Sequence, residues 1–130
     1  MFVLDASGAI ELVLNTAAGK RIASRLDDPA ETVHAPHLID VEVAHVLRRY
    51  ASLGALSDRR CEQALSHWRE LDVERHSHDL FLDRIRQLCH NVSAYDAAYV
   101  TLTEALSTVL VTGDGRLARV PGLAIRIELP

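Results

Sequence analysis

The sequence predicts an α/β fold in which helices cover a mostly parallel sheet of about five strands. Short apolar runs alternate along the chain with longer amphipathic segments, an alternation typical of such folds. The 130 residues, of which 48% are apolar and 25% charged, have the size and composition of a soluble globular protein. We therefore expect one domain spanning residues 1–130.

The expected strands are short, apolar and rich in β-branched residues. They are predicted at residues 2–5, 32–35, around 73, 108–112 and 124–129. The last of these alternates between apolar and polar residues, as a half-exposed strand does. Helices are predicted at residues 7–15, 17–28, 37–53, 57–71, 79–90 and 93–105, with a short helical turn near 115–119.

Several of these boundaries carry a local signal. A break between the first two helices is expected near Asn15, and Pro36 is expected to stop the second strand. Gly54 is a typical C-terminal stop for a helix, while Ser57 and Ser93 are suitable N-caps for the helices that follow them. In the helix predicted at 79–90, the apolar face is expected to contain Leu80, Leu82, Ile85 and Leu88.

Four acidic residues are placed where they can meet at one edge of this sheet. Asp5 closes the first strand and Asp114 follows the strand at 108–112, whereas Glu42 and Asp96 lie on helices. Ligands of parallel sheets bind beyond the carboxyl ends of the strands. Carboxylates grouped there repel one another, and a divalent cation between them relieves the repulsion.

Three of the acids also have a purely structural alternative. Asp5 is suited to a turn or a helix cap, and Asp96 forms a capping box with Ser93. Asp114 precedes Gly115, and Asp-Gly is typical of a hairpin turn that would bring the final strand back.

Glu42 is the most informative acid, because it interrupts a helix face that is expected to be buried. Leu38, Val41 and Val46 are assigned to that face by their spacing. A carboxylate buried there needs a partner, and the alternatives are Arg49 and a metal ion.

The remaining composition limits other kinds of site. A net charge of −4 argues against a nucleic-acid partner. However, the basic residues are nearly all arginine, whose side chain binds phosphate well. Two bound Mg²⁺ ions would also offset the net charge. Cys61 and Cys89 stand apart, so neither a zinc site nor a disulfide is expected. His76 and His78, the only tight histidine pair, are interpreted as part of a solvated loop, the alternative being a metal site. No apolar run is long enough to cross a membrane and no signal peptide is visible, so a cytoplasmic protein without membrane contact is expected.

The four acids lie in segments that resemble, in order and spacing, the acidic motifs of the PIN-domain nucleases, and above all the VapC-type toxins of toxin–antitoxin pairs. The segments are residues 3–7, 40–49, 94–99 and 110–117. The resemblance implies a PIN-like three-layer α/β/α sandwich. It also implies that Asp5, Glu42, Asp96 and Asp114 form a catalytic site for Mg²⁺ or Mn²⁺, with Asp114 in a supporting role.

Neighbouring polar residues are assigned supporting parts in this hypothesis. The hydroxyls of Ser7 and Thr112 lie beside the acids and are expected to orient a ligand or a water molecule. Arg116 and Arg49 are candidates for contact with substrate phosphate, the alternative being that they are ordinary surface arginines.

The resemblance implies a metal-dependent endoribonuclease that acts as the toxin of a type II toxin–antitoxin pair and cleaves structured RNA, such as tRNA or rRNA, with a metal-activated water. The implied partners are a cognate antitoxin, the RNA substrate and a second copy of the chain in a homodimer, with toxin and antitoxin forming a hetero-oligomer. The alternatives are a solitary RNA-processing PIN nuclease and a non-catalytic PIN-like module that binds RNA or a protein partner.

Overall fold

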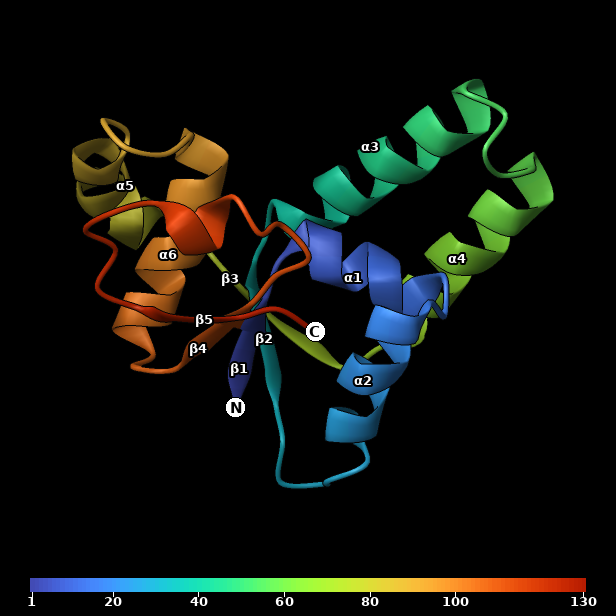
Figure 1. Ribbon diagram of the computed structural model, residues 1–130, viewed down its shortest axis with the longest axis horizontal. Coiled ribbons are helices and arrows are strands. Elements are labelled where there is room, and N and C mark those ends of the chain that lie inside the picture. Colours follow the sequence, from blue (N-terminus) through green and yellow to red (C-terminus); the bar gives the residue numbers. More distant parts are fainter.

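The computed structural model describes all 130 residues and contains a five-stranded sheet in which every strand pairing is parallel (Figure 1). The strands lie in the order β3-β2-β1-β4-β5 across the sheet. Their bounds are β1 Phe2–Leu4, β2 Val33–Pro36, β3 Val73–His76, β4 Val109–Val111 and β5 Arg126–Glu128. The prediction of about five, mostly parallel strands is confirmed.

Helices cover both faces of the sheet, which gives the expected three-layer α/β/α sandwich (Figure 1). On one side α1 packs against α2, α3 and α4, and on the other α6 packs against β1, β2 and β4 and carries α5. The helices are α1 Ala6–Val13, α2 Ala17–Leu26, α3 Ile39–Ser52, α4 Asp58–Glu70, α5 Leu82–Leu88 and α6 Ala94–Ala105, with 3₁₀ turns at η1 Asp79–Phe81 and η2 Leu117–Arg119. No helix combines the length and hydropathy that crossing a bilayer requires.

The central strands are buried on both faces, as their uninterrupted apolar sequences require. All three residues of β1 and of β4 are buried, and helix residues such as Trp68 complete the core. The predicted break between the first two helices is confirmed. Asn15 adopts a left-handed backbone conformation (φ 57°), and Thr16 then caps α2 by accepting a hydrogen bond from the Gly19 N–H. Asparagine tolerates this conformation better than most residues do.

Some predicted burial is wrong. Val41, assigned to the buried face of its helix, is 73% exposed, because the buried stripe of α3 is Ile39, Val43 and Leu47. Leu80 and Leu82 are also exposed, because the segment begins as a 3₁₀ turn and only Ile85 and Leu88 of the later α-helix face the core.

The second strand ends at Pro36, as expected, since Pro36 is its last residue. Two other local interpretations need correction. The hairpin alternative for Asp114 is wrong, because β5 pairs with β4 in parallel. His76 is not in a loop, since it ends β3 and its ring contacts that of His34 on β2. The imidazole of His78 accepts a hydrogen bond from the Leu38 N–H at 3.2 Å.

Candidate active site

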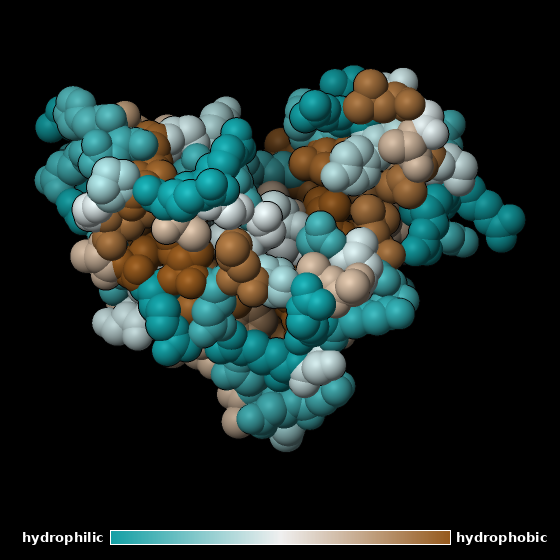
Figure 2. Space-filling model, in the orientation of Figure 1, coloured by the Kyte–Doolittle hydropathy of each residue, from teal (hydrophilic) through white to brown (hydrophobic).

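The four acids predicted from the sequence surround the carboxyl ends of the central strands. Asp5 lies between β1 and α1, and Asp114 follows β4. Glu42 and Asp96 lie in the first turns of α3 and α6. The surface is indented between the part that carries α5 and α6 and the part that carries α1 and α3 (Figure 2). The sheet topology therefore delivers the four residues to one region from four distant parts of the chain.

Asp5 is buried, and both oxygens of its carboxylate accept hydrogen bonds from the protein. Its Oδ1 accepts hydrogen bonds from the Ser7 hydroxyl at 2.7 Å and from the Gly8 N–H at 2.8 Å, and its Oδ2 accepts one from the Thr112 hydroxyl at 2.5 Å. Asp5 is also the N-cap of α1, so the capping role anticipated for it is present. The predicted role of Ser7 and Thr112 in orienting a ligand group is consistent with these contacts, because both hydroxyls hold the Asp5 carboxylate in place.

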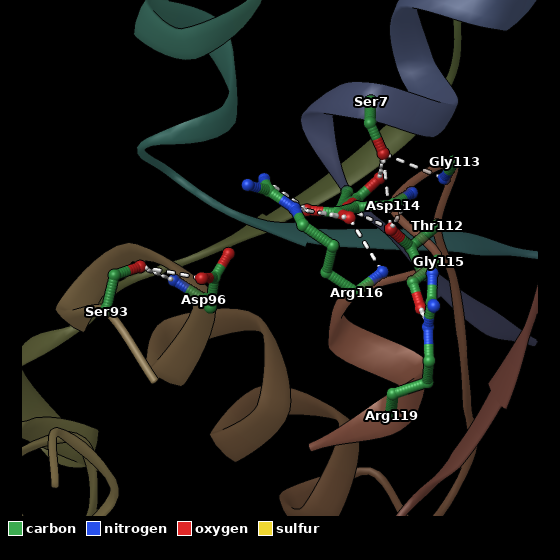
Figure 3. Close-up of polar contacts among 10 residues, drawn as sticks. Ser7, Ser93, Asp96, Thr112, Gly113, Asp114, Gly115, Arg116 and Arg119 are labelled. Atoms are coloured by element: carbon green, nitrogen blue, oxygen red, sulfur yellow. Dashed lines mark hydrogen bonds and ion pairs between the residues drawn. The ribbon is translucent and has the colours of Figure 1, made fainter. Parts of the chain in front are cut away.

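The same two hydroxyls hold the loop that follows β4. The Ser7 oxygen accepts the Gly113 N–H at 2.7 Å, and the Thr112 oxygen accepts the Asp114 N–H at 2.9 Å (Figure 3). Each hydroxyl donates to Asp5 and accepts from this loop. Asp114 is thus linked to Asp5 through a single side chain, although its carboxylate is engaged elsewhere.

The Asp114 carboxylate pairs with Arg116, a predicted phosphate contact. Nε of Arg116 lies 3.1 Å from Oδ1 and Nη2 lies 2.8 Å from Oδ2. This pairing lowers the pKa of Asp114 below its ordinary value. The Arg116 side chain is 88% exposed, and in Figure 3 it extends between the Asp114 network and Asp96. Its guanidinium therefore carries positive charge to the rim of the acidic region.

Glu42 has a partner that sequence reasoning did not identify. The Tyr99 hydroxyl donates to Glu42 Oε2 at 2.5 Å, and Tyr99 is itself buried. Arg49, the protein partner considered for Glu42, is exposed and forms no ion pair with it. The available signal was the position of Tyr99, one turn after Asp96, since a buried tyrosine usually finds a hydrogen-bond partner.

Asp96 has the helix-capping geometry anticipated for it. Ser93 is the N-cap of α6 and accepts the Asp96 N–H at 3.1 Å, while its hydroxyl donates to Asp96 Oδ2 at 2.8 Å. Asp96, Asp114 and Arg116 line an open pocket of about 270 Å³ together with Leu117. A separate hollow of about 320 Å³ beside β2 and β3 contains none of the four acids.

Burial and mutual repulsion act on these carboxyls. Burial raises the pKa of Asp5, and the negative charge of Asp96 adds to the increase. Burial also raises the pKa of Glu42, with further contributions from Asp5 and Asp96, against the opposing hydrogen bond from Tyr99. Asp5, Glu42 and Asp96 are therefore close enough to repel one another, whereas Asp114 is neutralised by Arg116.

The chemistry of this donor set fits a hard divalent cation. One lone-pair direction of Asp5 Oδ2 remains free, and neither Oε1 of Glu42 nor Oδ1 of Asp96 has a protein hydrogen-bond partner. Each of the three carboxylates thus keeps a lone pair for a ligand. Oxygen donors of this kind suit Mg²⁺ and Mn²⁺ better than softer metals. Their ligand atoms are not grouped within 4.8 Å of one another, so at least one of the carboxylates would reach the ion through a water molecule.

The fold and the site together define a class of protein, the parallel α/β/α domains in which acidic side chains are grouped at the C-terminal ends of the strands. Comparison with known families identifies the family within this class. The family model described as PIN domain matches residues 2–123. The chain belongs to the PIN-domain family, and the resemblance noted in its sequence is confirmed.

Individual relatives agree over most of the chain. The VapC ribonuclease Mb0985 of Mycobacterium bovis is 44% identical over 121 residues, which cover 91% of this chain and 89% of the relative. Ribonuclease VapC12 of Mycobacterium tuberculosis is 42% identical over 129 residues, covering 99% and 98%. Among solved structures, VapBC2 of Rickettsia felis, bound to a DNA fragment from its promoter, superposes with a TM-score of 0.69 at 11% identity over 98% of this chain and 97% of that one.

Proposed function

We propose that this protein is a metal-dependent endoribonuclease of the VapC type and acts as the toxin of a toxin–antitoxin pair. The relatives at 42–44% identity are named ribonucleases, and the alignments cover nearly the whole chain. The observation that carries the proposal is the group formed by Asp5, Glu42 and Asp96. Burial raises the pKa of Asp5 and of Glu42, the charge of Asp96 adds to both increases, and each of the three carboxylates keeps a lone pair for a ligand.

In this proposal Asp5, Glu42 and Asp96 hold the cation, and Asp114 supports the site through Thr112. A bound Mg²⁺ or Mn²⁺ would supply an activated water and neutralise charge on the phosphoryl group. The chain itself provides rigidity, because the hydroxyls of Ser7 and Thr112 fix both oxygens of Asp5. Attack by water leaves a 5′-phosphate on the product.

The substrate is RNA, whose backbone carries one negative charge per phosphate. Arg116 stands at the rim of the pocket and is proposed to contact a phosphate beside the scissile one, releasing Asp114 as it does so. Arg49 is exposed on α3, the helix that carries Glu42, and is proposed as a second contact. A cognate antitoxin and a second copy of the chain are the partners that the family resemblance implies, and they belong to the same proposal.

The proposal is tested by incubating purified protein with total RNA in 5 mM Mn²⁺ and mapping the ends of the products. Wild-type protein should cleave at defined positions and leave 5′-phosphates. Asp96→Asn should lose more than 100-fold of this activity, because it removes a metal ligand while the Ser93 cap still accepts the backbone N–H.

Asp83→Asn is the matched control. Asp83 lies in the first turn of α5, as Asp96 lies in the first turn of α6, and Asp83 is exposed. It should cleave like the wild type. Equal cleavage by the Asp96 and Asp83 variants would refute the site assignment. Absence of wild-type cleavage with every divalent cation tried would favour the non-catalytic alternative.

A further inference from the structure

A cluster of two histidines and one glutamate lies on strands β2 and β3, apart from the four acids. His34 of β2 is paired in register with Glu74 of β3, so their side chains lie on the same face of the sheet. His76 is two residues beyond Glu74 and therefore shares that face. His34 is buried, His76 is half-buried and Glu74 is exposed at the surface.

The ligand atoms of the three side chains converge. Nδ1 of His34 lies 2.9 Å from Nε2 of His76, and the two oxygens of Glu74 lie 3.6 and 3.7 Å from these nitrogens. One ligand atom from each residue can be chosen so that all lie within 4.8 Å of one another, and no other group of three His, Cys, Asp or Glu residues meets this condition. Two atoms bound to one ion at about 2.0–2.2 Å can be no more than roughly 4.4 Å apart. The observed separations fall within that limit.

The orientation of His34 is fixed by a neighbouring hydroxyl. Nε2 of His34 lies 2.9 Å from Oγ1 of Thr32, which can accept the ring proton and leave Nδ1 with a free lone pair. Without an ion, a single proton can bridge Nδ1 of His34 and Nε2 of His76.

We propose that His34, Glu74 and His76 form a binding site for a transition-metal ion, with Zn²⁺ the preferred ion. Two imidazoles and a carboxylate are a donor set that zinc uses, whereas the oxygen-only site at the strand ends suits Mg²⁺ or Mn²⁺. The ion would replace the proton shared by the two rings. Its fourth coordination position would face solvent, because Glu74 is exposed at the surface.

Such an ion would cross-link the edge strand β3 to β2. The neighbouring backbone already joins these strands to the start of α3, since the His37 N–H donates to the His76 carbonyl at 2.9 Å and the Leu38 N–H donates to His78. Leu38 is the N-cap of α3. We therefore expect bound zinc to stabilise the segment from which α3, the helix carrying Glu42, emerges.

The test is calorimetric titration of ZnCl₂ into untagged, chelator-stripped protein in saturating Mg²⁺, together with thermal melts. Wild-type protein should bind one Zn²⁺ per chain with micromolar or better affinity and melt at a higher temperature. His76→Ala and Glu74→Gln should weaken binding at least tenfold. Glu74 is exposed, so the second variant remains informative if the first does not fold.

His90→Ala is the matched control, because His90 is exposed and outside the cluster. It should bind zinc like the wild type. The proposal is overturned if the wild type binds no stoichiometric zinc, or if Glu74→Gln and His76→Ala bind as tightly as His90→Ala. It is also overturned if affinity is lost in Asp5→Asn instead, since the ion would then occupy the carboxylate site.

Discussion

Replacing Tyr99 by phenylalanine isolates the hydrogen bond that positions Glu42. The substitution removes one hydroxyl from a buried ring and leaves the half-buried Glu42 carboxylate without its protein donor. A hydrogen bond to a charged group is worth about 1.5–3 kcal/mol, and the lower end applies because Glu42 is partly solvated. With an unfolding entropy of roughly 2.1 cal/mol/K per residue, a loss of about 1.5 kcal/mol lowers Tm by about 5 °C.

The same substitution should weaken metal binding. Loss of a partner that orients a ligand typically costs about 10–100-fold in metal affinity. The Mg²⁺ concentration for half-maximal RNA cleavage should therefore rise by at least tenfold, while activity at saturating Mg²⁺ recovers much of the wild-type value. Tyr99→Phe is measured by differential scanning fluorimetry without metal and by cleavage of a labelled RNA across a Mg²⁺ series.

Tyr95→Phe is the matched control on the same helix, because Tyr95 is 64% exposed. It should leave both Tm and the Mg²⁺ midpoint unchanged. In the double variant with Glu42→Gln, the effect of Tyr99→Phe on Tm should shrink, because the acceptor is then uncharged. If Tyr99→Phe behaves like Tyr95→Phe in both assays, Tyr99 does not position Glu42 and the reasoning is refuted.

Three further outcomes are expected. In the presence of a chelator, Asp5→Asn should have the same melting temperature as the wild type near pH 4 and a higher one at pH 7. Burial raises the folded-state pKa of Asp5 above its unfolded value of about 3.9. The stability of the wild type therefore falls as the pH rises through the folded-state pKa. Equal melting temperatures at pH 7 would contradict this. Mn²⁺ at 100 times its Kd should raise the wild-type Tm by about 10 °C through about 2.7 kcal/mol of binding energy, and Asp5→Asn should abolish the shift. Gly19→Ala should lower the free energy of unfolding by roughly 3 kcal/mol, because the added Cβ would lie 1.9 Å from the Glu11 carbonyl oxygen. The measurement is urea denaturation, and an unchanged urea midpoint would show that α1 and α2 can move apart without cost.

Much of the sheet could be predicted because its strands are short and apolar. Phe2–Leu4 and Val109–Val111 are buried on both faces and therefore show continuous apolar runs that no surface element would have. The helix α3 was predicted less well, since its apolar residues occur on more than one side. Val41 lies two positions from Ile39, on nearly the opposite face of the helix, so proximity in sequence was misleading.

The candidate site shows where sequence reasoning ends. Asp5 and Asp114 could be placed from strand ends alone, because the carboxyl ends of parallel strands share an edge. The contact of Tyr99 with Glu42 joins α6 to α3 across 57 positions and depends on how two helices pack, which periodicity does not specify. The approach of His34 to His76 depends on the pairing register of β2 with β3, and no local pattern in either strand reveals that register.

The hydrogen bond between Thr112 and Asp5 has a consequence for biosynthesis. It joins residues 107 positions apart, and β1 pairs with β4, so the first strand made has no neighbour on that side until most of the chain has been translated. Long-range closure of this kind comes late in folding. The carboxylate group is therefore incomplete on a growing polypeptide until β4 has been made.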